Sequence, residues 1–158
     1  MSIVVARVDD RLVHGQVVIG WGRPLELNRI VLVDAEVAAS DFERDLYRMA
    51  VPAGIEVEFL RPAEAPARLA VLGGGPDRVL VLTGTVAGMT WLARASDQIR
   101  AVNLGGIHAG PGRREYLRYV YLTPDELADL RSLEAGGVRV TAQDLPTSAP
   151  VSLESLAS

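Results

Sequence analysis

The chain has 158 residues and a formal net charge of −4, with 49% hydrophobic residues and no cysteine. This length and composition suit a globular protein with its own core, so we expect residues 1–158 to form a single domain. The lack of cysteine excludes disulfides, thiolate zinc sites and a cysteine nucleophile, while the acidic balance disfavours a nucleic-acid partner. Without a basic leader or an apolar run of 18 residues, neither a signal peptide nor a membrane-spanning helix is expected.

Short segments rich in apolar and β-branched residues recur along the chain and predict seven strands. The second, fourth and fifth are apolar nearly throughout, which is typical of strands that are covered on both faces. The third alternates between polar and apolar residues, so we expect it nearer an edge of the sheet. In chain order the predicted strands are residues 3–8, 29–34, 55–60, 78–83, 99–104, 117–122 and 138–143.

Helix signals lie between most of these strands. Ser40 and Glu43 have the spacing of a capping box, in which the first side chain accepts a bond from the backbone three residues on. Phe42, Leu46 and Met49 would then share one helical face. Weaker signals predict two further helices, over residues 62–72 and 85–95.

The clearest helix start is Thr123 followed by Pro124, and this helix is expected to end near Gly136. Strands that alternate with helices predict an α/β fold with right-handed crossovers. The sequence therefore predicts a mainly parallel, doubly wound β-sheet of about six or seven strands, with helices on both faces.

Both histidines of the chain fall in loops that should open at the same edge of this sheet. His14 lies in the segment DDRLVHGQ, which connects the first strand to the following helix. His108 lies in the loop after the fifth strand. Ligands of open parallel sheets bind beyond the carboxyl ends of the strands, so the two histidines mark a candidate site.

The residues around His14 suit a histidine that accepts and donates a phosphoryl group. A neutral imidazole is a good nucleophile near neutral pH, and a helix start favours an anion. Gly15 lets the backbone approach closely, and Arg11 has a fork of donors that matches phosphate oxygens. On the residues alone, a surface histidine beside an Arg–Asp ion pair remains an equally good interpretation.

Other residues of the candidate site would support this chemistry. Arg7 could add a second positive charge, and Asp9 or Asp10 could accept the ring N–H of His14 and so determine which nitrogen attacks. The glycine-rich loop around His108 could wrap a phosphate with its backbone amides, or could be a plain turn.

The segment ARVDDRLVHGQVVIGW resembles the mannose/fructose/sorbose family of enzyme IIB components of the bacterial phosphotransferase system. The similarity continues through NRIVLVDAEVA, MAVPAGIEVEFL, NLGGIHAGPGRREY and VYLTPDELADLRSLEAGGVRV. The resemblance implies a cytoplasmic α/β domain without metal or organic cofactor. It also implies that His14 takes a phosphoryl group from a IIA protein and passes it to a sugar held by the membrane components IIC and IID.

Two alternatives and one question of assembly stay open at this point. The chain could be a regulatory phosphoprotein with the same His14 chemistry but no transport partner. It could also be a metal-dependent hydrolase that uses Asp9, Asp10, His14 and His108, although no tight His-x-x-x-His spacing supports this. Association of the chain with copies of itself is compatible with either interpretation.

Overall fold

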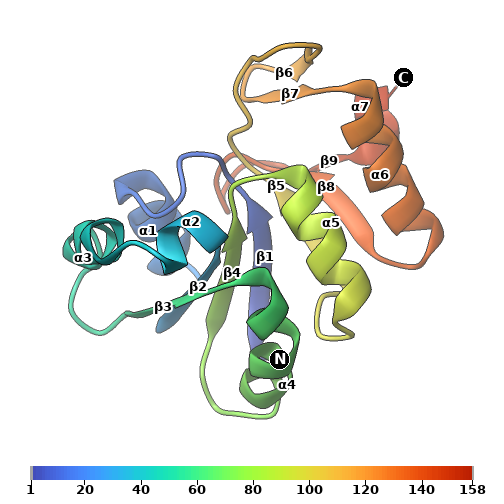
Figure 1. Cartoon of the computed structure of the whole chain (residues 1–158). Helices are drawn as coiled ribbons and strands as arrows, with labels where there is room; N and C mark the ends of the chain where they lie inside the picture. The colour runs from blue at the N-terminus through green and yellow to red at the C-terminus, as the bar shows by residue number, and fades with distance from the viewer. Residues whose placement is uncertain (1, 158) are drawn as a thin grey trace.

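A computed structural model of the chain describes residues 2–157, and its central element is a seven-stranded sheet (Figure 1). The strand order is β3-β2-β4-β1-β5-β8-β9, and every neighbouring pair is parallel except β8 and β9. The predicted mainly parallel sheet is confirmed, with the alternating third strand at an edge. The strands are β1 (Ile3–Val8), β2 (Arg29–Val33), β3 (Glu56–Leu60), β4 (Val79–Thr83), β5 (Ala101–Leu104), β8 (Arg139–Ala142) and β9 (Val151–Ser152).

Helices cover both faces of the sheet, and two hydrophobic clusters form between the layers (Figure 1). Successive side chains of a strand point to opposite faces, so Ile30 and Leu32 join the cluster beneath α1, whereas Val31 and Val33 join the other. The residues of β4 likewise alternate between the two clusters, which explains why β2 and β4 are apolar at nearly every position. The helices are α1 (Gly15–Gly22), α2 (Ala35–Ala38), α3 (Asp41–Met49), α4 (Ala65–Gly73), α5 (Val86–Ala95), α6 (Pro124–Ala135) and α7 (Leu153–Ala157), with a short 3₁₀ turn η1 (Pro62–Glu64) before α4.

The helix α6 begins as its sequence predicts. The Thr123 hydroxyl accepts a bond from the Glu126 backbone N–H at 3.0 Å, and the Glu126 carboxylate accepts one from the Thr123 N–H at 2.8 Å. The Ser40 hydroxyl likewise accepts from the Glu43 N–H at 3.1 Å at the start of α3. Both caps therefore satisfy donors that a helix start would otherwise leave unpaired.

The apolar residues of α3 lie on its exposed side. The exposed fractions of Phe42 and Met49 are 74% and 83%, and Leu46 is also exposed. The helix instead contacts the sheet through Tyr47, whose ring centroid lies 6.5 Å from that of Phe59. The apolar face that helical spacing predicts for this helix is therefore exposed rather than buried.

The prediction of a sixth sheet strand over residues 117–122 is wrong. This segment is split between two strands of a separate antiparallel hairpin, β6 (Arg114–Leu117) and β7 (Val120–Leu122), with a turn at Arg118 and Tyr119. The hairpin packs over the sheet because Val120 and Leu122 are fully buried in the larger hydrophobic cluster. Among residues 2–157, no helix combines the length and apolar content that crossing a membrane requires.

Candidate active site

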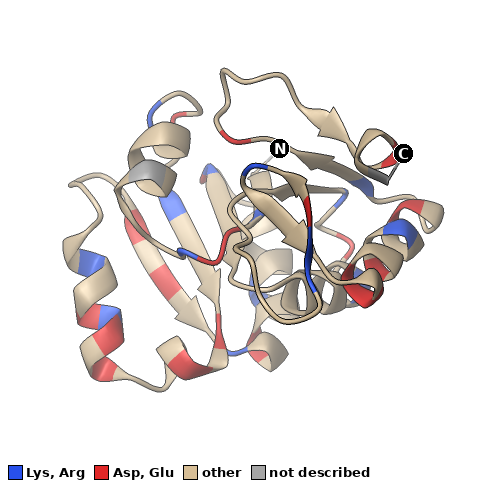
Figure 2. Cartoon of the chain, turned by 90° about the horizontal axis from the view of Figure 1, so that it is seen from above, with Lys and Arg blue, Asp and Glu red and all other residues tan. Residues whose placement is uncertain are grey.

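The loop between β1 and α1, residues 9–14, lies at the carboxyl edge of the sheet, which faces the viewer in Figure 2. The Asp9 backbone N–H donates to the Thr83 carbonyl at 3.0 Å, and the Asp10 N–H donates to the Gly106 carbonyl at 2.8 Å. The loop is thus bonded to the ends of both neighbouring strands. The topology brings His14 and His108 to one edge, as the sequence predicts.

Asp9 lies between two arginines beneath this edge. Its Oδ2 accepts a bond from Arg11 Nη2 at 2.8 Å and one from Arg7 Nη2 at 3.4 Å, while its Oδ1 accepts from Arg11 Nε at 2.9 Å. The side chains of Asp9 and Arg7 are fully buried, whereas 29% of Arg11 is exposed. The carboxylate therefore orients the Arg11 guanidinium by a two-pronged contact and leaves it accessible at the surface.

The ionisation of this cluster follows from burial and mutual charge. Burial acts to raise the pKa of Asp9, but the hydrogen bonds from Arg11 and the charges of both arginines outweigh it, so this pKa lies below its ordinary value. Burial lowers the pKa of Arg7 to about 10. All three groups are therefore charged at neutral pH, and the cluster keeps a net positive charge.

The sequence suggested that Arg7 adds a second positive charge to the site, but its side chain lies fully buried beneath the site. Its guanidinium donates to the Gln143 carbonyl at 2.8 Å and to the Asp144 carbonyl at 3.1 Å, and it lies 4.4 Å from the ring centre of Trp21. A Cβ at Gly105 would lie 2.3 Å from its Nη2, so only glycine permits this approach. Arg7 thus joins β1, α1 and the end of β8 under the site.

His14 is half-buried immediately before α1, and its carbonyl accepts the Val18 N–H at 2.9 Å in the first turn of the helix. Burial lowers the pKa of His14, and the positive charge of Arg11 lowers it further against the opposing effect of Asp9. At neutral pH the imidazole is therefore neutral and has a nucleophilic lone pair next to a cation that can bind an anionic group.

Asp10 contacts the second histidine. Its Oδ2 accepts a bond from the His108 backbone N–H at 2.8 Å, and its Oδ1 lies 2.6 Å from the His108 ring Nδ1. Although Asp9 and Asp10 are adjacent in sequence, they serve different partners. The sequence left either acid open as a partner of His14 and did not indicate the pairing of Asp10 with His108.

A small pocket of about 150 Å³ joins Arg11 and His108 at this edge. Gly106 and Ile107 also line it, together with four residues that the sequence patterns did not indicate: Arg118, Tyr119, Tyr121 and Asp144. Asp144 follows the carboxyl end of β8. Because ligands of parallel sheets bind beyond the carboxyl ends of the strands, the position of Asp144 after β8 was a signal for the site in the sequence.

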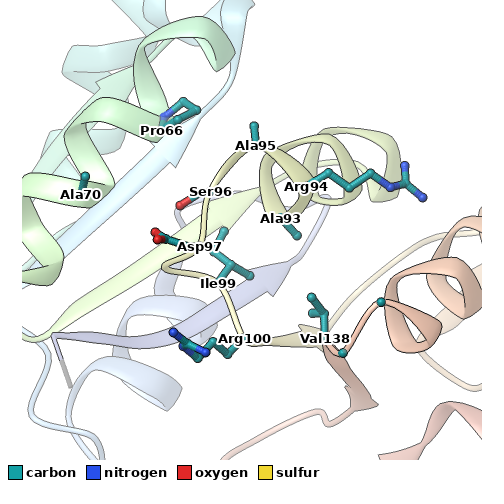
Figure 3. A pocket seen from close by; sticks show the side chains of 12 residues that line it. Pro66, Ala70, Ala93, Arg94, Ala95, Ser96, Asp97, Ile99, Arg100 and Val138 are labelled. Atoms are coloured by element: carbon teal, nitrogen blue, oxygen red, sulfur yellow. The ribbon is translucent and has the colours of Figure 1, made fainter.

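A larger hollow of about 650 Å³ lies at the opposite edge of the sheet, before β5 and β8 begin (Figure 3). Arg94, Asp97 and Arg100 are among its lining residues, but neither histidine is. Within residues 2–157, no three His, Cys, Asp or Glu side chains are grouped so that they could hold a metal ion. The reactive groups therefore gather at the carboxyl edge.

The lowered pKa of His14 leads to a titration prediction. We expect the ring resonances of His14 to titrate with a midpoint below pH 6.5, so that the neutral form predominates at pH 7. Replacing Arg11 with Ala removes one cause of the shift and should move the midpoint upward, while burial still holds it down. NMR titration of the wild-type and Arg11→Ala proteins measures both, and a midpoint above pH 6.5 in the wild type would contradict the assignment.

Comparison with known proteins places this chain in a family. The family model described as "PTS system sorbose subfamily IIB component" matches residues 3–158. The sorbose-specific EIIB component of Klebsiella pneumoniae is 31% identical over 148 residues, which cover 91% of this chain and 90% of that protein.

A relative of known structure and a longer relative, whose name combines IIA and IIB, agree with this family match. The crystal structure of the IIBSor domain of the K. pneumoniae sorbose permease superposes with a TM-score of 0.86 at 28% identity and covers 99% of this chain and 97% of that one. The mannose-specific EIIAB component of Escherichia coli K12 is 26% identical over 147 residues, which are 93% of this chain and 46% of that protein. The family match and these relatives together show that the chain belongs to the sorbose subfamily of phosphotransferase-system IIB components.

Proposed function

We propose that this chain is a cytoplasmic phosphocarrier subunit of a sugar phosphotransferase system. It accepts a phosphoryl group from a IIA protein on His14 and passes it to a sugar held by the membrane components IIC and IID. The observation that carries this proposal is the half-buried imidazole of His14 at the carboxyl edge of the sheet, whose pKa is lowered by burial and by the nearby charge of Arg11. A neutral nitrogen beside an oriented cation suits attack on phosphorus.

Each residue of the site has a definite part in the proposed transfer. In the first step, the bond between phosphorus and the donor atom of the IIA protein breaks while a bond from phosphorus to a ring nitrogen of His14 forms. Arg11, oriented by Asp9, stabilises the phosphoryl oxygens, and Arg7 supports Asp9 from below. At Gly15 a Cβ would have no atom within 4 Å, so this position lies open toward an incoming group.

The names of the relatives support the proposed partners. The E. coli relative named mannose-specific EIIAB component is about twice the length of the matched segment, since that segment is 46% of it. Its name combines a IIA with a IIB component in one chain. This supports a IIA protein as the direct phosphodonor, and the sorbose-specific relatives support a sugar as the final acceptor.

Reconstitution tests the proposal directly. The chain is incubated with phosphoenolpyruvate, the general phosphotransferase proteins and a IIA domain, and the labelled residue is mapped by mass spectrometry at alkaline pH. We expect one acid-labile phosphoryl group on His14. Stable label on a hydroxyl side chain, or no uptake from a IIA protein that is itself phosphorylated, would overturn the proposal.

Arg11 provides a second, quantitative test. Replacing it with Ala should slow phosphoryl transfer to His14 on the order of 10²–10³-fold, the usual effect of losing one preorganised donor. Arg11→Lys keeps the charge but not the planar fork, so its rate should be intermediate. Arg23→Ala is the matched control, because Arg23 is an exposed arginine just beyond α1. Equal rates for Arg11→Ala and Arg23→Ala would remove Arg11 from the mechanism.

A further inference from the structure

The contact between Asp10 and His108 determines which ring nitrogen of His108 has a free lone pair. A carboxylate only accepts hydrogen bonds, so the Nδ1 atom, 2.6 Å from Asp10 Oδ1, must donate its hydrogen. In the neutral ring the Nε2 atom is then the proton acceptor. The His108 side chain is 70% exposed, which leaves this acceptor accessible from outside the protein.

Two further contacts hold the His108 backbone in place. Asp10 Oδ2 accepts the His108 N–H at 2.8 Å, and Arg113 Nη1 donates to the His108 carbonyl at 2.9 Å. Arg113 is itself held by Glu126, whose carboxylate accepts bonds of 3.2 and 3.1 Å from its guanidinium. Because Glu126 also caps α6, the loop is anchored to a helix on one side and to the loop of His14 on the other.

His108 and Arg11 line the same pocket of about 150 Å³. Gly106 also lines this pocket, and a Cβ there would come within 3.0 Å of Arg11 Nε and 3.2 Å of Asp9 Oδ1. The backbone next to His108 therefore packs directly on the Asp9–Arg11 pair. In the proposed reaction, an acceptor that reaches the phosphoryl oxygens at Arg11 also enters the pocket that His108 lines.

The two steps of a phosphocarrier differ in their need for a base. A neutral imidazole attacks phosphorus with its lone pair and loses no proton as it attacks, whereas a hydroxyl group must lose one. We propose that His108 is the general base for a hydroxyl acceptor, with Asp10 and Arg113 as its positioning residues. The proposal rests on the proposed function of His14 and concerns the second step.

In this step the bond between phosphorus and the His14 nitrogen breaks and a bond from phosphorus to the acceptor oxygen forms. The acceptor proton moves to Nε2 of His108, and it later leaves to solvent because the side chain is exposed. His108 never bonds phosphorus. Its loss should therefore affect transfer to oxygen acceptors and spare transfer to nitrogen acceptors.

Discharge to two small acceptors separates these outcomes. The full chain is phosphorylated on His14, freed of its donor, and mixed with glycerol or with imidazole, and the loss of phosphohistidine is followed by ³¹P NMR. We expect His108→Gln to slow discharge to glycerol roughly 10²-fold, the low end for a lost general base, and to leave discharge to imidazole unchanged. The wild-type reaction with glycerol should be slower in D₂O, and this isotope effect should be reduced in the variant.

A variant of the positioning residue Asp10 and a matched control complete the test. Asp10→Asn should lose the single Nδ1–H tautomer of His108 seen by ¹⁵N NMR and slow discharge to glycerol selectively. Arg114→Ala is the control, since Arg114 lies beside Arg113 and stacks on Tyr116 at 5.4 Å. Equal slowing with both acceptors, or no slowing in His108→Gln, would overturn the role of His108.

The proposed function fails by a different result. If phosphorylated IIA does not charge His14, that proposal falls, and the phosphorylated chain is prepared with phosphoramidate instead. The comparison of glycerol with imidazole then decides the role of His108 by itself. Because His108 is 70% exposed and phosphoramidate can label it as well, only chains that carry label on His14 alone are compared. Label that a phosphorylated IIA protein places on His108 would contradict its assignment as a base.

Discussion

A His14→Gln variant is expected to take up no phosphoryl group from phosphorylated IIA, under conditions in which the wild-type chain is fully labelled. Glutamine has a similar polar end but no nitrogen lone pair that can attack phosphorus, so the loss should be complete. The variant should still fold, because His14 is only half-buried and precedes α1. Circular dichroism and thermal unfolding check the fold, and intact-mass spectrometry at alkaline pH measures the label.

The chain contains its own matched control for this experiment. It has two histidines, so His108→Gln removes the other imidazole at the same edge of the sheet. We expect His108→Gln to reach the wild-type extent of labelling. Stoichiometric label in His14→Gln would reject His14 as the acceptor, and label lost equally from both variants would show that the two histidines act as one unit.

Replacing Asp9 with Asn is expected to cost about 3–5 kcal/mol of the free energy of unfolding, the typical cost of removing one partner from a buried ion pair. Asp9 and Arg7 are fully buried, and Asp9 also binds Arg11. The amide leaves a buried guanidinium without its counter-charge. Urea unfolding monitored by circular dichroism at pH 7 measures the difference.

Asp77→Asn is the matched control for this loss. Asp77 binds Arg29 Nε at 2.8 Å, but both side chains are partly exposed, so we expect a clearly smaller cost than at Asp9. Equal losses for the two variants would contradict a special role of burial at Asp9.

The same pair has a defined dependence on pH. The folded-state pKa of Asp9 lies below its ordinary value of 3.8, so its contribution is complete above that value and is lost as pH falls through the folded-state pKa. The difference in stability between the wild type and Asp9→Asn should therefore shrink in acid. A difference that stays constant from pH 7 to pH 2 would show that the charge of Asp9 is not its cause.

The parallel sheet and its principal edge were predictable because they depend on local patterns. Buried parallel strands must be apolar on both faces, and the runs that became β2 and β4 satisfy this. In β5 only Val102 and Leu104 join a cluster, while Ala101 is exposed. The caps at Ser40 and Thr123 form within three residues of sequence. Once the first loop after a strand is known, the position of His14 at the carboxyl edge follows from topology.

Features that depend on packing against the rest of the molecule were not predictable in this way. The segment of residues 117–122 has the composition of one strand, yet its turn and its partner in β6 depend on packing of Val120 and Leu122 on the core. The exposed face of α3 is a similar case, since helical spacing groups Phe42 with Leu46 without saying which side meets the sheet.

The sequence by itself determined the class of fold, the placement of His14 and Arg11 in one loop, and the resemblance to a IIB family that the comparisons confirm. Only the tertiary structure decided that Arg7 lies buried under the site and that Asp9 serves the arginines while Asp10 serves His108. The physical reason is that the partner of an ionisable side chain depends on which opposite charges the fold brings near it and on how deeply both are buried. Adjacent acids in a loop point to different neighbours, and those neighbours lie up to 98 residues away along the chain.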